Sequence, residues 1–212
     1  MADRATPVTY ADQFVDWLVD MGYTHCFFVA GGNVMHFLNS ARTRVECVPV
    51  VHEVAAGIAA EYFNALRQEG GGRAFALVTA GPGLTNILTA IGGAYLESRE
   101  LLVVGGQVKS SDLATGGIRQ RGIQEIDGIA IAAPACVATM QIASPQPRAE
   151  IERVVAAGIN GRPGPVFIEF CLDAQAAAPV GDVEPARLPA PEPLEPEPSV
   201  TRSVAQSVVE SS

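Results

Sequence analysis

The sequence predicts an α/β fold: a doubly wound, mainly parallel six-stranded sheet with helices on both faces, followed by a proline-rich C-terminal tail. Short apolar segments alternate along the chain with segments of helical periodicity. The apolar segments are hydrophobic throughout rather than at every second position, which is typical of parallel strands covered on both faces. Hydrophobic residues make up 48% of the 212 residues and charged residues 17%, which is enough apolar material for a substantial core.

The first half of the chain supplies three of the expected strands. Thr9 is typical of a helix N-cap, and apolar residues follow it at helical spacing until Gly22 ends the helix. Apolar segments then predict strands at 25–29, 45–51 and 74–79, with a short helix through Met35 and Leu38 and a longer helix over 53–68 between them.

The second half continues the alternation of strands and helices. Gly81-Pro82-Gly83 turns the third strand into a helix that reaches Ile91. Further strands are expected at 101–104, 137–142 and 166–170, separated by a long loop over 107–122, a weaker helix over 123–132 and a helix over 147–160. Irregular segments as long as this loop are often functional.

The composition changes near residue 174. Alanine-rich sequence passes into a run of Pro and Glu, which is typical of an extended linker. Beyond it, Val200, Val204 and Val208 fall on one helical face. We therefore expect a domain over 1–173, a linker over 174–199, and a terminal amphipathic helix or disordered tail over 200–212.

Charge and composition exclude several classes of function. The net charge is −9 without a basic cluster, so nucleic-acid binding is not expected. No apolar run approaches the roughly 18 residues that a membrane-spanning helix needs, and the first residues lack the apolar core of a signal peptide. The four cysteines are widely spread without a CxxC pair, as expected for buried reduced thiols. We expect a cytoplasmic protein.

Candidate functional residues cluster where expected strands end. The second strand leads into His52-Glu53, which places a carboxylate at the carboxyl end of a parallel strand, where open α/β sheets bind ligands. Three glycine-containing turns follow other strands, and glycine there lets a ligand approach the backbone closely. These turns are Gly31-Gly32, Gly81-Pro82-Gly83 and Gly105-Gly106-Gln107. No GxGxxG follows the first strand and no Walker A motif is present, which argues against a nucleotide-binding module.

These residues also match a known family. Over about residues 8–175 the chain resembles the pyrimidine-binding (N-terminal) domain of thiamine diphosphate-dependent enzymes, specifically the acetolactate synthase-like group. The resemblance is carried by six motifs in order: Ala30-Gly31-Gly32, His52-Glu53 with Ala55-Ala56, Gly81-Pro82-Gly83-Leu84-Thr85-Asn86, Gly106-Gln107-Val108, Gln124-Glu125, and Gly161-Arg162-Pro163-Gly164-Pro165-Val166.

The resemblance implies a role for each matched residue. Glu53 is the expected catalytic residue, which hydrogen-bonds the aminopyrimidine of thiamine diphosphate and activates it. The implied cofactor-binding residues are Gly31, Gly32, Glu53, Gly81, Pro82, Gly83 and Asn86. Gln107 and Gln124 are expected on the substrate side. His52 is either a substrate-side acid or a structural histidine, and His36 either faces the substrate or lies on a helix surface.

Two departures from the family pattern qualify this expectation. The segment 132–138 has no basic residue, which puts FAD binding and branched-chain amino-acid synthesis in doubt. The family's Gly-Asp-Gly motif for Mg²⁺ and diphosphate is also missing, the nearest sequence being Gly181-Asp182-Val183. We therefore expect no metal site in this chain, and Mg²⁺ ligands on a diphosphate-binding partner subunit, in a heterotetramer with two copies of each.

The expected reaction is decarboxylation of a 2-oxo acid, pyruvate in the first instance, with transfer of the two-carbon unit to a carbonyl acceptor. The Gly31–His36 segment looks more like relatives from sugar and secondary metabolism than like branched-chain synthases. Three alternatives stay open: a decarboxylase subunit that releases an aldehyde, a non-catalytic assembly or regulatory subunit, and a fragment of a longer enzyme instead of a natural split subunit.

Overall fold

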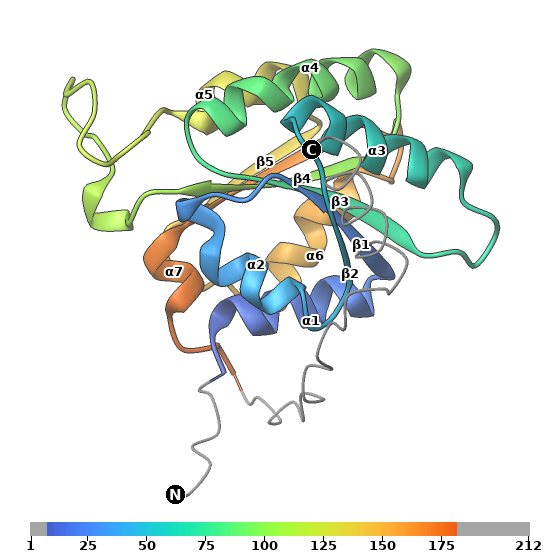
Figure 1. The fold of residues 1–212 in the computed structure, drawn as a ribbon, viewed down its shortest axis with the longest axis horizontal. Helices are drawn as coiled ribbons and strands as arrows, with labels where there is room; N and C mark the ends of the chain where they lie inside the picture. Colours follow the sequence, from blue (N-terminus) through green and yellow to red (C-terminus); the bar gives the residue numbers. More distant parts are fainter. Residues whose placement is uncertain (1–7, 182–212) are drawn as a thin grey trace, which may run out of the picture.

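A six-stranded, entirely parallel sheet forms the centre of the molecule (Figure 1), so the predicted fold class is confirmed. The computed structural model describes residues 8–181. The strands are β1 (Tyr23–Phe28), β2 (Glu46–Pro49), β3 (Arg73–Val78), β4 (Leu101–Gln107), β5 (Ala138–Ile142) and β6 (Pro165–Cys171), in the order β2-β1-β3-β4-β6-β5. All six carboxyl ends therefore meet at one edge of the sheet.

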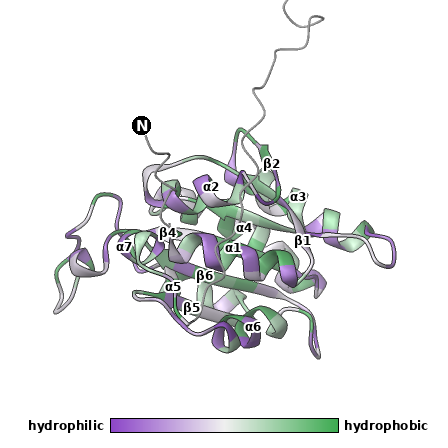
Figure 2. Ribbon diagram, turned by 90° about the horizontal axis from the view of Figure 1, so that it is seen from below, coloured by the Kyte–Doolittle hydropathy of each residue, from purple (hydrophilic) through white to green (hydrophobic). Residues whose placement is uncertain are grey.

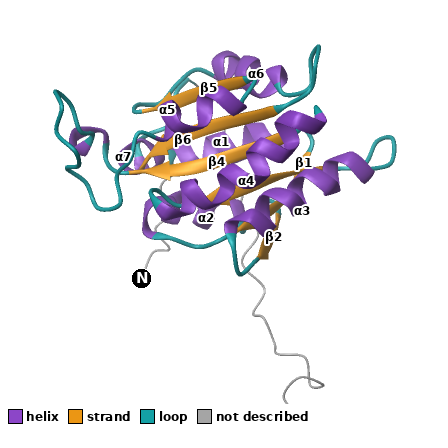
Figure 3. Cartoon of the chain, turned by 90° about the horizontal axis from the view of Figure 1, so that it is seen from above, coloured by secondary structure: helices purple, strands orange, loops and turns teal. Residues whose placement is uncertain are grey.

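Helices cover both faces of this sheet (Figures 1 and 3). One face packs against α1 (Tyr10–Asp20), α2 (Met35–Ala41), α6 (Arg148–Ala157) and α7 (Leu172–Ala176). The other packs against α3 (Glu53–Leu66), α4 (Pro82–Glu97) and α5 (Gly128–Ala132). Short 3₁₀ turns occupy Gly32–Val34, Ser110–Asp112 and Ala133–Ala135. In Figure 2, α6 carries both hydrophilic and hydrophobic residues, as a helix with one buried face should.

The two faces of the sheet have different cores. Under α1 and α2 the core is aromatic, with edge-to-face contacts that join Phe14 to Phe37 and Phe37 to Phe75. Between α3, α4 and the sheet the buried side chains are mostly small, including Ala56, Ala60, Ala90, Ala94 and Ala76. Small side chains let two helices approach closely, and the side chain of Asn86 in the second turn of α4 hydrogen-bonds that of Glu53, the first residue of α3.

Two elements differ from the sequence-based expectation. The helix expected over 123–132 begins only at Gly128, because Gln124 has a left-handed backbone (φ 61°) and the Asp127 side chain caps the helix by accepting from Ala130 N. In addition, β4 continues through Gly105-Gly106-Gln107, which the sequence suggested as a turn. These three residues pair with 169–171 of β6 and therefore belong to the sheet.

The short helix α7 lies across the boundary expected at 173/174, and Gln175 in it donates to the carbonyl oxygens of Asn33 and Phe170. The boundary itself stays a prediction. Most of the expected linker and the terminal helix fall in 182–212, outside the described residues. Within 8–181, no helix combines the length and apolar character needed to cross a membrane.

Candidate active site at the carboxyl edge of the sheet

Glu53 lies at the sheet edge where the parallel strands end. It is the first residue of α3 and follows β2 by a short connection, and it is only 8% exposed. Asn86 of α4 donates its Nδ2 hydrogen to Oε2 of Glu53 at 2.8 Å. In the described part of the chain, Oε1 of Glu53 has no hydrogen-bond partner. The carboxylate is thus held in place by one oxygen, with the other available to a ligand.

Three of the glycines expected to bind the cofactor lie beside this carboxylate or at the same edge of the sheet. A Cβ on Gly83 would lie 3.0 Å from Thr79 Cγ2 and 3.5 Å from Glu53 Oε1, and one on Gly31 would lie 2.3 Å from Thr79 Cβ. A Cβ on Gly32, by contrast, would have no atom within 4 Å. Thr79 therefore holds the β1 and β3 turns together, a role that its position at a strand end did not reveal in the sequence.

The Gly81 turn carries the segment that contains Gln124. Gly81 has φ 63° and ψ −117°, and a Cβ there would lie 2.6 Å from the Gln124 carbonyl oxygen. Gly81, Pro82 and Gln124 line one cavity of about 770 Å³. The structure thus brings together Gln124 and the cofactor turn, although 42 positions separate them in the chain.

We expect Gly81→Ala to lower the free energy of unfolding by about 1–3 kcal/mol, because the backbone there suits only glycine and the new methyl group meets a backbone carbonyl. Urea denaturation of the chain at neutral pH measures this. Gly93→Ala on the same helix is the matched control: it has ordinary helical geometry and open space around it. The control should gain about 0.5–1 kcal/mol, and equal stability of the two variants would contradict the account.

The two histidines proposed for the substrate side lie in different settings. His52 is an exposed residue whose Nδ1 accepts from Val54 N at 3.2 Å, so its ring caps α3 directly before Glu53. His36 is the second residue of α2 and is half-buried, and its carbonyl accepts from Ser40 Oγ. The capping bond gives His52 a structural role; a part in proton transfer stays a prediction for both.

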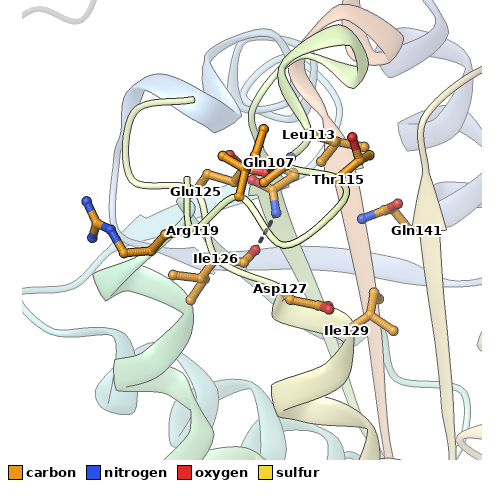
Figure 4. Close-up of a pocket in the computed structure, with 11 residues that line it drawn as sticks. Gln107, Leu113, Thr115, Arg119, Glu125, Ile126, Asp127, Ile129 and Gln141 are labelled. Atoms are coloured by element: carbon orange, nitrogen blue, oxygen red, sulfur yellow. Dashed lines mark hydrogen bonds between the residues drawn. The ribbon is translucent and has the colours of Figure 1, made fainter. Parts of the chain in front are cut away.

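Gln107 lies at the floor of a second cavity, of about 560 Å³ (Figure 4). Its Nε2 donates to the Ile126 carbonyl at 2.8 Å and to Glu169 Oε1 at 2.9 Å, and its Oε1 accepts from Val108 N. Gln141 also lines this cavity and donates to Glu169 Oε2 at 2.6 Å. Because both N–H groups and the oxygen of its side-chain amide are hydrogen-bonded, Gln107 is placed to fix the shape of the cavity floor.

Glu169 was not expected from the sequence. It is 2% exposed in the middle of β6, and its carboxylate accepts from Gln107 and Gln141. Burial raises the pKa of Glu169 to about 7, against the lowering effect of these hydrogen bonds. A lone charged residue within the apolar run 166–170 was the signal in the sequence that could have identified it.

Glu125 closes the loop that borders both cavities. Its carboxylate accepts from the backbone N–H groups of Ala114, Arg121 and Gly122. Although burial raises it, these N–H donors bring the pKa of Glu125 below its usual range. The Gln124-Glu125 motif therefore has a structural role: the Glu125 carboxylate anchors the loop, and Gln124 packs against the Gly81 turn.

Among residues 8–181, no group of three or more His, Cys, Asp and Glu side chains is arranged to hold a metal ion. The candidate site thus consists of one anchored carboxylate, a set of close backbone turns, and two neighbouring cavities. Such a site presents one carboxylate oxygen among closely packed backbone turns, and its described residues offer no cluster of oxygen ligands for a cation.

Comparison with known proteins agrees with this geometry. The profile of the family described as "Thiamine pyrophosphate enzyme, N-terminal TPP binding domain" matches residues 8–131. The chain is 33% identical over 150 residues to 2-hydroxyacyl-CoA lyase 2 of Caenorhabditis elegans, covering 69% of this chain and 22% of that relative. It is 31% identical over 166 residues to the acetolactate synthase large subunit of Buchnera aphidicola, covering 77% and 28%. The acetolactate synthase isozyme 3 large subunit of Escherichia coli gives the same figures, 31%, 77% and 28%. The chain spans about a quarter of the length of these relatives.

Proposed function

Because the chain belongs to the thiamine diphosphate-dependent enzymes, as their N-terminal cofactor-binding domain, we propose that Glu53 binds the aminopyrimidine ring of the cofactor and controls its proton. One observation carries this proposal: Glu53 is buried, with one oxygen tied to Asn86 and the other available at the sheet edge. A carboxylate in that state can hold a hydrogen bond to a ring nitrogen in a fixed direction.

The surrounding residues fit such a ring. Gly83 leaves free the space beside Glu53 Oε1 that a side chain would fill, and Gly81 and Pro82 form the turn directly before it at the start of α4. Asn86 orients the carboxylate, and Gly31 and Gly32 border the same edge from β1. When bound, thiamine diphosphate supplies the stabilisation of a carbanion next to a former carbonyl group. The protein's part is to orient the ring, hold its proton and exclude water.

The proposed reaction is decarboxylation of a 2-oxo acid such as pyruvate and transfer of the two-carbon unit to a carbonyl acceptor. Its support is the similarity to proteins named acetolactate synthase. Relatives named as lyases match at comparable identity, 33% over 150 residues for one of them. Release of an aldehyde or cleavage of a carbon–carbon bond is therefore the second candidate.

We assign the diphosphate group and Mg²⁺ to a diphosphate-binding partner, in an assembly with two copies of each half. The absence of a Gly-Asp-Gly motif from the sequence supports this assignment. So does an apolar surface on α3 and α4, where large side chains are solvent-exposed in the isolated chain. They are Ile58 (43% exposed), Tyr62 (47%), Leu66 (78%) and Leu96 (79%).

Calorimetric titration of thiamine diphosphate with Mg²⁺ tests both proposals. The chain alone should bind weakly, and addition of a diphosphate-binding partner should produce tight binding together with 2-oxo acid turnover. Product analysis with and without a carbonyl acceptor then separates carboligation from aldehyde release. Tight, Mg²⁺-dependent binding by the chain alone would overturn the shared site, and a partner complex that binds without turnover would favour a non-catalytic subunit.

A further inference from the structure

Arg119 lies between the two cavities at the carboxyl edge of the sheet. It lines both the cavity of about 770 Å³ that contains Gly81 and Pro82 and the cavity of about 560 Å³ that contains Gln107. Figure 4 shows its side chain at one end of the group of lining residues, with Gln141 at the other end. Its guanidinium extends away from Gln107 and Gln141 (Figure 4), so of the two spaces it is placed to act on a molecule in the cavity beside the Gly81 turn.

This guanidinium differs from most of the others in the chain. Within residues 8–181, side-chain donors of eight arginines make hydrogen bonds: Arg42, Arg44, Arg67, Arg73, Arg99, Arg148, Arg153 and Arg162. In the same range, Arg119 and Arg121 have no side-chain hydrogen bond or ion pair, and of these two only Arg119 lines a cavity. Its five N–H donors remain available for an oxyanion.

The loop that carries Arg119 is anchored at both ends. The Glu125 carboxylate accepts from Ala114 N on one side of Arg119 and from Arg121 N and Gly122 N on the other. These hydrogen bonds to one carboxylate fix the positions of both ends of the loop. Arg119 is thus presented to the cavities from a defined position.

The other charged groups that line the cavities are two carboxylates, each of which accepts hydrogen bonds from the backbone. Glu125 is surrounded by its three N–H donors, and Asp127 uses Oδ1 to accept from Ala130 N and cap α5. Among the described residues, Arg119 is the one cation that lines either cavity. The cavities therefore contain one unengaged positive charge beside the proposed cofactor turn.

We infer that Arg119 determines substrate specificity by binding a second, distal oxyanion of the substrate, a carboxylate or a phosphonate at the end opposite the 2-oxo acid group. This inference rests on the proposed function. The carboxylate that departs as carbon dioxide is a poor partner for Arg119, because an ion pair there would stabilise the ground state more than the transition state. A distal oxyanion keeps its charge throughout the reaction, and a guanidinium can bind it through two parallel hydrogen bonds.

A binding experiment on the 212-residue chain tests this without catalysis. The probes are glutarate and 3-phosphonopropionate, with pentanoate as the control that lacks the second anionic group. Titrations followed by the NMR signals of the arginine Nε–H groups should show saturable shifts with at least one dianion and none with pentanoate. Arg119→Met should weaken that binding at least about tenfold, Arg119→Lys should restore part of it, and Arg121→Met in the same loop should leave it unchanged.

A second arm uses the assembled enzyme with its diphosphate-binding partner. The ratio of kcat/KM for 2-oxoglutarate over 2-oxopentanoate should fall at least about tenfold in Arg119→Met, mainly through KM, and stay constant in Arg121→Met. Binding of pentanoate as tight as that of the dianions, no shift with any probe, or equal loss in both variants would overturn the inference. Failure of the proposed function would look different, because neither oxo acid would be consumed while the binding arm still reported the oxyanion site.

Discussion

Glu53→Gln is expected to lower turnover by roughly 10²–10⁴-fold, the usual contribution of a positioned acid–base group, while the domain stays folded. The amide oxygen of the new side chain can still accept from Asn86 Nδ2, so the 2.8 Å contact between α3 and α4 can survive. What is lost is an oxygen that can hold and release the proton of the ring nitrogen. The measurement is 2-oxo acid consumption by the assembled enzyme with saturating thiamine diphosphate and Mg²⁺.

The matched control is Glu61→Gln, two turns further along the same helix. Glu61 is also buried, at 4% exposure, but its carboxylate faces Arg99 at 3.2 Å rather than the sheet edge. It should change stability and leave turnover within a few-fold of the original. Near-normal turnover in Glu53→Gln, or an equal loss in both variants, would rule out Glu53 as the residue that activates the cofactor.

Much of the fold could be predicted because its strands are covered on both faces. Runs such as 74–78 and 101–104 are apolar at every position, and β3 and β4 are in fact buried throughout or nearly so. Glu53 could be found for a related reason: a carboxylate that follows an apolar run within two residues is expected near the end of a strand. Local sequence carries this information, since it depends on a few neighbouring residues.

Other features depend on contacts between distant segments, which local patterns do not record. The helix before Ala132 starts late because Gln124 packs on Gly81, far away in the chain. Likewise, the glycines at the end of β4 stay in the sheet because β6 pairs with them. A glycine pair after an apolar run is equally compatible with a turn and with a strand that a neighbour completes.

Glu169 is the clearest case of a site that only the tertiary structure reveals. Three strands supply the Glu169, Gln107 and Gln141 side chains, and Gly128 at the start of α5 packs against the Glu169 carboxylate. Burial, assisted by the negative charge of Asp127, raises the pKa of Glu169 from 4.5 to about 7. The carboxyl group of the folded protein is therefore protonated over a pH range in which the unfolded chain is ionised.

We expect Glu169→Gln to remove a pH dependence of stability between about pH 4.5 and 7. Because the folded protein holds this proton more tightly than the unfolded chain, the original protein loses stability as the pH rises through that window. The loss from this group is about 3 kcal/mol, from 1.36 kcal/mol for each unit of pKa difference. Urea denaturation of both proteins from pH 4.5 to 7.5 should therefore show their stability difference shifting by this amount in favour of the glutamine variant.

The matched control is Glu97→Gln, at a carboxylate that is 64% exposed on α4, and its plot of stability against pH should run parallel to that of the original protein. A parallel curve for Glu169→Gln as well would mean that Glu169 ionises equally readily in the folded and unfolded protein.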